Sequence, residues 1–195
     1  DSGIDQIVSV ENVGKEYILC RGNGQTSLEH PIIVAHTDST RIWLNGKTEP
    51  DTILPAGGYF LVPATYFLAT NSMYIRTSES VFVYQMLGGF PTGPTCLGTV
   101  SLMFIPPINC GLINKLDNLH LPNKLDDVGF TGHLMIVAMR DSAVTVRMGS
   151  MTTMRAPLAR AAACWAVEQV AGMEGSGAWE ISTAYRSGVA QDQGS

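Results

Sequence analysis

Short runs of alternating apolar and polar residues, separated by turn residues, cover most of this chain. Alternation with a period of two is typical of β-strands, because successive side chains of a strand point to opposite faces of the sheet. The pattern predicts strands at residues 16–21, 31–36, 41–44 and 59–62. Residues 73–77 and 80–85 predict a further hairpin around Ser78-Glu79, and its second strand is rich in the β-branched and aromatic residues that buried strands favour.

One segment of the chain occurs twice in similar form. The segment IVAHTDS at 33–39 reappears as IVAMRDS at 136–142, 103 residues later, and Gly46 and Gly149 match at the same offset. A fourteen-residue window therefore holds six identities, where chance gives about one. Each copy predicts a strand, a polar turn, a second strand and a closing glycine, which together make a β-hairpin. We therefore predict an all-β chain of two tandem β-sandwich-like units, at 1–95 and 96–195, that arose by internal duplication.

Residues 156–173 break this pattern and predict one short Ala-rich helix. Pro157 lies near the start, Gly172 lies at the end, and the alanines between them favour helix on intrinsic propensity. The helix would be an insertion in the second copy, which opens with a strand at 99–105. That copy also lacks a counterpart of the hairpin at 73–85, so we expect the second unit to be incomplete at its C-terminus.

The N-terminal segment offers a way to complete the second unit. Residues 5–13 alternate in part and predict a strand. A sandwich that lacks a hairpin exposes unpaired backbone groups and an apolar face, and a strand donated by another chain can cover both. We therefore expect self-association in which residues 5–13 complete the second unit of a neighbouring copy.

Composition and charge exclude several classes of partner. Charged residues make up 15% of the chain, below the roughly 25% of ordinary soluble domains, yet no apolar run reaches the roughly 18 residues of a membrane span. The net charge is −5 and the 12 Lys and Arg residues are scattered, so neither nucleic-acid binding nor membrane insertion is expected. The start shows no signal-peptide pattern, so we expect a mature or excised part of a larger protein.

Four cysteines leave two interpretations open. Cys96 and Cys110 flank a strand and a Pro-Pro turn, which makes them the most plausible local disulfide, and Cys20 and Cys164 would then pair by elimination. The alternative is four buried free thiols in a reducing compartment. No C-x-x-C pair occurs, so a zinc ribbon or a thioredoxin-like site has no support.

Two sets of polar residues are candidate metal or catalytic groups. His36 and Asp38 form an H-x-D pair, but the second copy replaces the histidine with Met139 and keeps the aspartate, which favours a turn-forming role. The other set, Asp117, Asp126 and Asp127, lies in the 114–129 crossover loop without the spacing of a known calcium loop, so a solvated loop is the favoured interpretation. We predict no catalytic, cofactor or metal site.

Exposed aromatic residues are candidates for a carbohydrate-binding surface, on which sugar rings stack. The candidates are Trp43, Tyr59, Tyr66 and Trp179. Their positions in predicted strands favour burial in a core over exposure on a platform. A carbohydrate-binding surface therefore stays an alternative.

Several segments together resemble a known family. They are Glu16-Tyr17-Ile18, residues 33–38, VFVYQ at 81–85, FIPPINC at 104–110 and the crossover at 116–132. In these the chain resembles the N-terminal domain family of IgGFc-binding proteins, found in animal mucus proteins and large bacterial surface proteins, over about three-quarters of its length. The resemblance implies an extracellular all-β module of adhesins or matrix proteins without enzymatic activity.

We therefore expect a non-enzymatic structural or adhesive module of a secreted or cell-surface protein, of which a self-associating filament or matrix subunit is one form. Its expected partners are copies of itself, neighbouring domains of the same polypeptide, a glycan or a surface protein. No cofactor is expected. The alternative is a carbohydrate-binding accessory module or a degenerate hydrolase domain. A hydrolase would place two carboxylates about 5–10 Å apart across one cleft.

Overall fold

The computed structural model describes residues 5–22, 26–69, 71–88 and 101–108, and further along the chain the backbone of the strands between residues 115 and 184. All strand pairs whose register is described are antiparallel. The helical elements among the described residues are three short 3-10 turns: η1 (Val10–Asn12), η2 (Thr26–Leu28) and η3 (Ala64–Tyr66). The predicted all-β character is confirmed.

The chain forms two compact units, of which the first consists of residues 1–112 and 161–163. A seven-stranded sheet builds this unit. Its strands are β1 (Gly14–Cys20), β2 (Pro31–Ala35), β3 (Thr40–Leu44), β4 (Thr52–Leu54), β5 (Tyr59–Leu61), β6 (Ser72–Leu87) and β7 (Ser101–Phe104).

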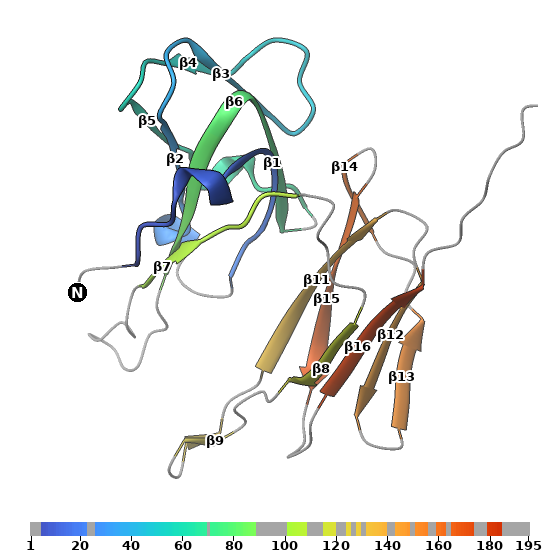
Figure 1. Cartoon of the computed structure of the whole chain (residues 1–195). Helices are drawn as coiled ribbons and strands as arrows, with labels where there is room; N and C mark the ends of the chain where they lie inside the picture. The colour runs from blue at the N-terminus through green and yellow to red at the C-terminus, as the bar shows by residue number, and fades with distance from the viewer. Residues whose placement is uncertain are drawn as a thin grey trace, which may run out of the picture. The chain divides into compact units, whose positions relative to one another are not determined.

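The long strand β6 organises this sheet. Its first half, residues 72–77, pairs with β1 and β3, and its second half, residues 81–87, pairs with β2 and β7. The strand curves along its length (Figure 1), and side chains at alternate positions from Met73 to Gln85 are buried in both halves, apart from Glu79 at the centre of the bend. The predicted hairpin around Ser78-Glu79 is wrong, because both of its arms bond to other strands and not to each other.

Both halves of β6 contribute to a single core. Ile75 from the first half and Val83 from the second are fully buried in the same hydrophobic cluster. The buried members of this cluster are Tyr17, Leu19, Ile33, Ala35, Ile42, Leu44, Leu54, Val62, Met73, Ile75, Val81, Val83 and Ile105. Full burial of one aliphatic side chain stabilises the fold by about 1.5–3 kcal/mol, so this cluster supplies most of the driving force for folding of the first unit.

The second unit consists of residues 113–160 and 164–195. Its strands are β8 (Lys115–Leu119), β9 (Lys124–Leu125), β10 (Val128–Gly129), β11 (Gly132–Met139), β12 (Ala143–Met148), β13 (Met151–Arg155), β14 (Ala159–Ala162), β15 (Trp165–Met173) and β16 (Trp179–Ala184). The last two residues of β14 are assigned to the first unit. The strands form a four-stranded sheet in the order β13-β12-β16-β8, a three-stranded sheet in the order β11-β15-β14, and the pair β9-β10.

In each unit the repeated segment, 33–39 or 136–142, begins in one strand, β2 or β11, and the next strand, β3 or β12, follows it, but the two strands do not form a hairpin. In the first unit β2 and β3 both pair with β6, and in the second unit β11 pairs with β15 while β12 pairs with β13 and β16. Each strand of a duplicated segment thus has partners of its own. The predicted pairing within each copy is therefore wrong, and in the first unit the turn at 36–39 carries the chain from one set of partners to the other.

The predicted helix at 156–173 is also wrong, because this part of the chain contains β14 and β15. The strand β15 pairs with β11 over nearly its whole length, from Met139 opposite Trp165 to Gly132 opposite Met173. Helix propensity differs among ordinary residues by less than about 1 kcal/mol each, and tertiary pairing overrides it routinely. Trp165 and Val167 favour the pleated surface in any case.

Two further predictions near the first sheet need correction. Residues 5–13 form no strand but an extended segment that leads into η1. The strand predicted to open the second copy at 99–105 is β7, and it pairs with β6 of the first sheet. The predicted boundary between residues 95 and 96 lies outside the described residues.

Candidate binding surface

The bend in the middle of β6 is held by the buried hydroxyl of Tyr17. This oxygen lies within hydrogen-bonding distance of the carbonyl oxygen of Val81 and accepts the backbone N–H of Gly14 at 2.7 Å. The Thr77 hydroxyl also lies at the bend, 2.6 Å from the carbonyl oxygen of Glu79. Burial raises the pKa of Tyr17 to about 12, despite the opposing hydrogen bond with Gly14. The phenol therefore stays protonated at neutral pH, and its hydrogen bonds stabilise the bend of β6.

The H-x-D pair lies in the turn between β2 and β3. The Asp38 carboxylate accepts the backbone N–H of Ala56 at 2.8 Å, and Ser39 adopts a φ of 56°, which fits the predicted turn. The His36 ring meets the edge of Phe82, with 6.0 Å between the ring centroids. These contacts agree with the predicted turn-forming role of Asp38, which ties this turn to the segment that precedes β5.

A second carboxylate, Asp51, closes the loop after β3. Its side chain is almost fully buried, accepts the backbone N–H of Leu44 at 2.9 Å and the Tyr66 hydroxyl at 3.1 Å, and pairs with Lys47. Burial raises the pKa of Asp51, but these hydrogen bonds outweigh it and hold the pKa below its ordinary value. The hydrogen bond to Asp51 raises the pKa of Lys47, so the pair stays ionised at neutral pH.

A third carboxylate, Glu29, is buried at the far end of β6. It accepts the backbone N–H groups of Gly22 at 3.2 Å and Gly88 at 3.0 Å, and the side-chain amide of Gln85 at 3.1 Å. The same amide donates to the carbonyl oxygen of Cys20 at 2.9 Å. A Cβ atom on Gly22 would lie 2.7 Å from this carboxylate, so a larger residue there would require the Glu29 side chain to shift. Glu29 therefore holds two loops against the end of the sheet.

The cysteines and the acidic crossover offer no assembled site among the described residues. Cys20 forms no disulfide with a described residue, and burial raises the pKa of its thiol to about 12, so the thiol is protonated and a poor nucleophile at neutral pH. Cys96, Cys110 and Cys164 lie outside the described residues, and both predicted disulfides stay predictions. Asp126 and Asp127 lie outside them too, and Asp117 belongs to β8, where only the backbone is described.

The aromatic candidates for a sugar platform lie on separate elements. Trp43 belongs to β3, Tyr59 to the edge strand β5 and Tyr66 to η3, and the ring contacts found among the described residues join none of them to another. Trp179 belongs to β16 of the second unit. The structure thus does not bring these four residues together in one described surface.

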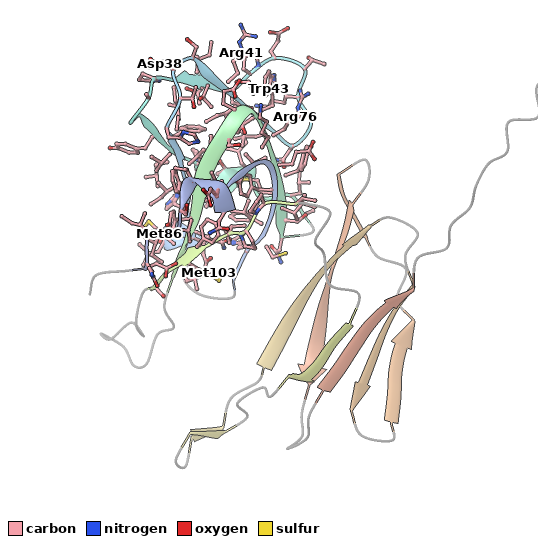
Figure 2. The ribbon with its side chains drawn as sticks, in the orientation of Figure 1. Asp38, Arg41, Trp43, Arg76, Met86 and Met103 are labelled. Atoms are coloured by element: carbon pink, nitrogen blue, oxygen red, sulfur yellow. The ribbon has the colours of Figure 1, made fainter. Side chains whose placement is uncertain are left out.

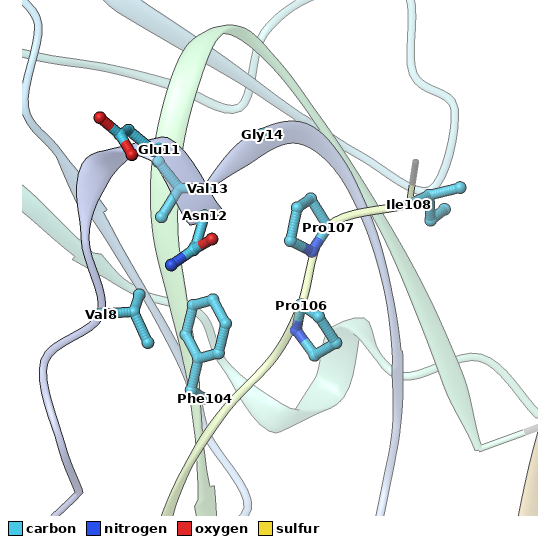
Figure 3. A pocket seen from close by; sticks show the side chains of 9 residues that line it. All are labelled: Val8, Glu11, Asn12, Val13, Gly14, Phe104, Pro106, Pro107 and Ile108. Carbon is cyan, nitrogen blue, oxygen red and sulfur yellow. The ribbon is translucent and has the colours of Figure 1, made fainter. Parts of the chain in front are cut away.

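A shallow groove of about 560 Å³ runs between residues 8–14 and 104–108 (Figure 3). Val8, Phe104 and Pro107 line it, and a Cβ atom on Gly14 would lie 2.6 Å from the Pro107 side chain. The N-terminal segment forms one wall of this groove because Asp5 accepts the backbone N–H of Phe104 at 2.6 Å. In this structure residues 5–13 thus lie against the first unit of their own chain.

The outer face of the sheet differs between the two halves of β6. On the second half it is apolar: the outward side chains of Tyr84 and Phe104 meet edge to face with 5.5 Å between centroids, and the edge strand β5 leaves Tyr59 70% and Leu61 46% exposed. On the first half it carries two arginines and a tryptophan, Arg41, Trp43 and Arg76 (Figure 2). Sequence reasoning missed both arginines.

Only the spacing of Arg41 and Trp43, two residues apart on one strand, pointed to a shared face, and Arg76 joins them solely through the pairing of β3 with β6. The Arg76 guanidinium lies 4.5 Å from the centroid of the Trp43 ring. Trp43 is half-buried, and both arginines are exposed. These three residues, named the Arg–Trp patch below, are our candidate binding surface.

The fold and this surface define a β-sheet module whose buried polar groups hold loops in place and whose outer sheet face carries exposed arginine and aromatic side chains. The chain belongs to the IgGFc binding protein family, whose sequence model matches residues 1–173. No curated protein and no solved structure matches it. Among the described residues we find no helix that has both the length and the apolar character needed to span a membrane.

Proposed function

We propose that this chain is an extracellular, non-enzymatic module that binds protein partners in an adhesive or structural assembly. Membership of the IgGFc binding protein family is the observation that carries this proposal. The use of the buried carboxylates supports it as well. Glu29 and Asp51 each accept backbone N–H groups at loop ends, so neither is free to act as an acid or a base on a substrate.

We also propose that the two units are copies of one sandwich-like module. The order β13-β12-β16-β8 in the second unit matches β4-β3-β6-β1 in the first. The duplicated sequence occupies equivalent places, since β2 and β11 precede β3 and β12 in the chain. Tandem copies give a binding module two related surfaces on one polypeptide, and this multiplies avidity where a partner presents repeated sites.

Biolayer interferometry with the intact chain immobilised tests the proposed function. Two analytes are offered: the Fc fragment of IgG, because the family description names it, and the soluble chain itself, because self-association is one form of the expected assembly. We expect saturable binding to at least one of them. Absence of binding to both, together with turnover of glycoside substrates, would contradict the proposal and favour a hydrolase.

A further inference from the structure

The three residues of the Arg–Trp patch occupy neighbouring outward positions of the sheet. Trp43 and Arg76 are directly paired across β3 and β6, and Arg41 lies two residues before Trp43 on the same strand. Side chains at such positions lie on one face within about 5–8 Å of each other. Figure 2 shows all three at the same end of the first unit. The patch is therefore one continuous surface.

The stacking of Arg76 on Trp43 leaves the guanidinium ready to bind a ligand. The indole N–H of Trp43 donates to the carbonyl oxygen of Thr48 at 3.2 Å, which helps to fix the ring, and the Arg76 guanidinium lies over that ring. A cation–π contact relies on the positive charge of the guanidinium and does not use up its N–H donors. The Arg76 side chain forms no hydrogen bond or ion pair with any other described residue, so these donors are available.

Arg41 extends the patch with a second free guanidinium beside an apolar side chain. Its backbone N–H is bonded to the Ser78 hydroxyl at 2.9 Å, but its side chain has no hydrogen bond or ion pair within the described part of the chain. Across the strand pair Arg41 lies opposite Ile53, which is 55% exposed. The surface thus offers two planar cations, an aromatic ring and an aliphatic group.

We propose, on the basis of the function proposed above, that the Arg–Trp patch binds carboxylate side chains on the surface of a protein partner, with an apolar side chain of that partner seated beside Trp43 and Ile53. Guanidinium groups match carboxylates with two parallel hydrogen bonds, which gives both affinity and orientation. Arginine and tryptophan are the residue types that most often dominate the energy of protein interfaces, particularly where they cluster.

Charge decides between a protein partner and a polyanionic glycan. The chain carries a net charge of −5, and the exposed Glu16 lies directly opposite Arg76 on β1. A densely sulfated polymer extends over many residues, so it would meet the negative net charge of the chain beyond a patch that holds two cations. A protein can present one or two carboxylates to the arginines and place neutral residues elsewhere, so the balance of charges favours a protein.

The test uses NMR titration of the ¹⁵N-labelled intact chain with two probes: a capped peptide of alternating glutamate and leucine, and a heparin oligosaccharide of similar length. We expect the peptide to shift the Trp43 indole signal and the amide signals of β3 and the first half of β6. The double variant Arg41→Ala/Arg76→Ala should weaken peptide binding by about tenfold or more. Arg76→Lys, which keeps the charge and loses the planar fork, should weaken it by a smaller factor.

Lys15→Ala is the matched control, because Lys15 is an exposed cation of the same unit that is paired with Glu79 outside the patch. It should leave peptide binding unchanged. Unaltered amide spectra of the variants away from the patch confirm that they fold. The proposal is overturned if the peptide produces no shifts at the patch, if the double variant binds it as the parent does, or if heparin binds the patch more tightly. If the double variant still binds its analyte in interferometry, the proposed role of the patch is wrong and the proposed function is unaffected.

Discussion

The two halves of β6 share one core and face solvent in different ways. Ile75 and Val83 are fully buried in the same cluster, one from each half. On the opposite face the first half carries Arg76, stacked on Trp43, whereas the second half carries Tyr84, packed against Phe104. The alternation that fills the core therefore leaves the outer positions free to differ. The outward side chains of one half can therefore change, and with them the contacts they make, without disturbing the core that both halves build.

A buried charge on the second half should produce the largest effect. Val83→Asp places a carboxylate among fully buried aliphatic side chains, and we expect a loss of about 4 kcal/mol or more of the free energy of unfolding. Phe82→Asp changes the neighbouring outward position and should cost less than half as much. Urea denaturation measures both. Equal losses at these two positions would show that the two faces of β6 do not differ as described.

Removal of Glu29 should have the next largest effect, because this carboxylate anchors loops at the end of the second half. Glu29→Ala leaves the buried N–H of Gly88 and the partly buried N–H of Gly22 without their acceptor. We expect a loss of about 3 kcal/mol in stability. Glu49→Ala, at an exposed position, should change stability by less than about 0.5 kcal/mol. Thermal unfolding of the two variants compares them, and similar midpoints would contradict an anchoring role.

The bend that separates the halves should contribute a smaller amount. Tyr17→Phe removes the hydroxyl near Val81 and should cost about 1–2 kcal/mol. Because folding raises the pKa of Tyr17 from 10.0 to about 12, the stability linked to its protonation is complete below pH 10 and is lost as the pH rises towards 12. Stability measured between pH 8 and 12 should thus fall less steeply in Tyr17→Phe. An identical slope in both proteins would argue against this burial of the phenol.

The smallest effect on stability should come from the Arg–Trp patch. Arg76→Ala removes an exposed cation–π contact, which is worth about 0.5–1 kcal/mol at such sites. We therefore expect a shift in the unfolding midpoint near the limit of detection in urea titrations. A loss of several kcal/mol would mean that Arg76 supports the fold, and the contrast between a structural face and a contact face would fail.

Much of the first sheet could be predicted from alternation alone. Strands β2, β3 and β5 lie within or close to the predicted runs, because their inward residues repeat every second position. The hairpin at Ser78-Glu79 was wrong because polar residues at a bend look like turn residues in sequence. The signal against a turn was also present. The apolar residues Met73, Ile75, Val81 and Val83 stand at odd-numbered positions on both sides of the bend, whereas pairing across a two-residue turn at 78–79 would place the inward residues of the second strand at even-numbered positions.

The candidate site and the second unit were less predictable for a physical reason. Arg76 meets Trp43 only because β6 pairs with β3, and no local pattern encodes a contact between residues that far apart. The alanine-rich segment became strands because β11 offers a partner for β15, an interaction that propensity cannot register. Features that depend on neighbouring residues were easier to predict. The turn-forming role of Asp38 was predicted from the Asp-Ser pair that recurs in the second copy, and the Asp38 side chain does bond within this turn region.

The central place of β6 has a consequence for the order of events during synthesis. Among the described strands, β1 has no partner other than β6, and β2 and β3 reach each other only through it. A nascent chain that has left the ribosome as far as β5 therefore presents several apolar strands with no common sheet. Contacts so distant in sequence form slowly. The first unit can fold only after β6 has been synthesised as far as Leu87. Until then its apolar strands are exposed, and either chaperones or rapid synthesis must prevent their aggregation.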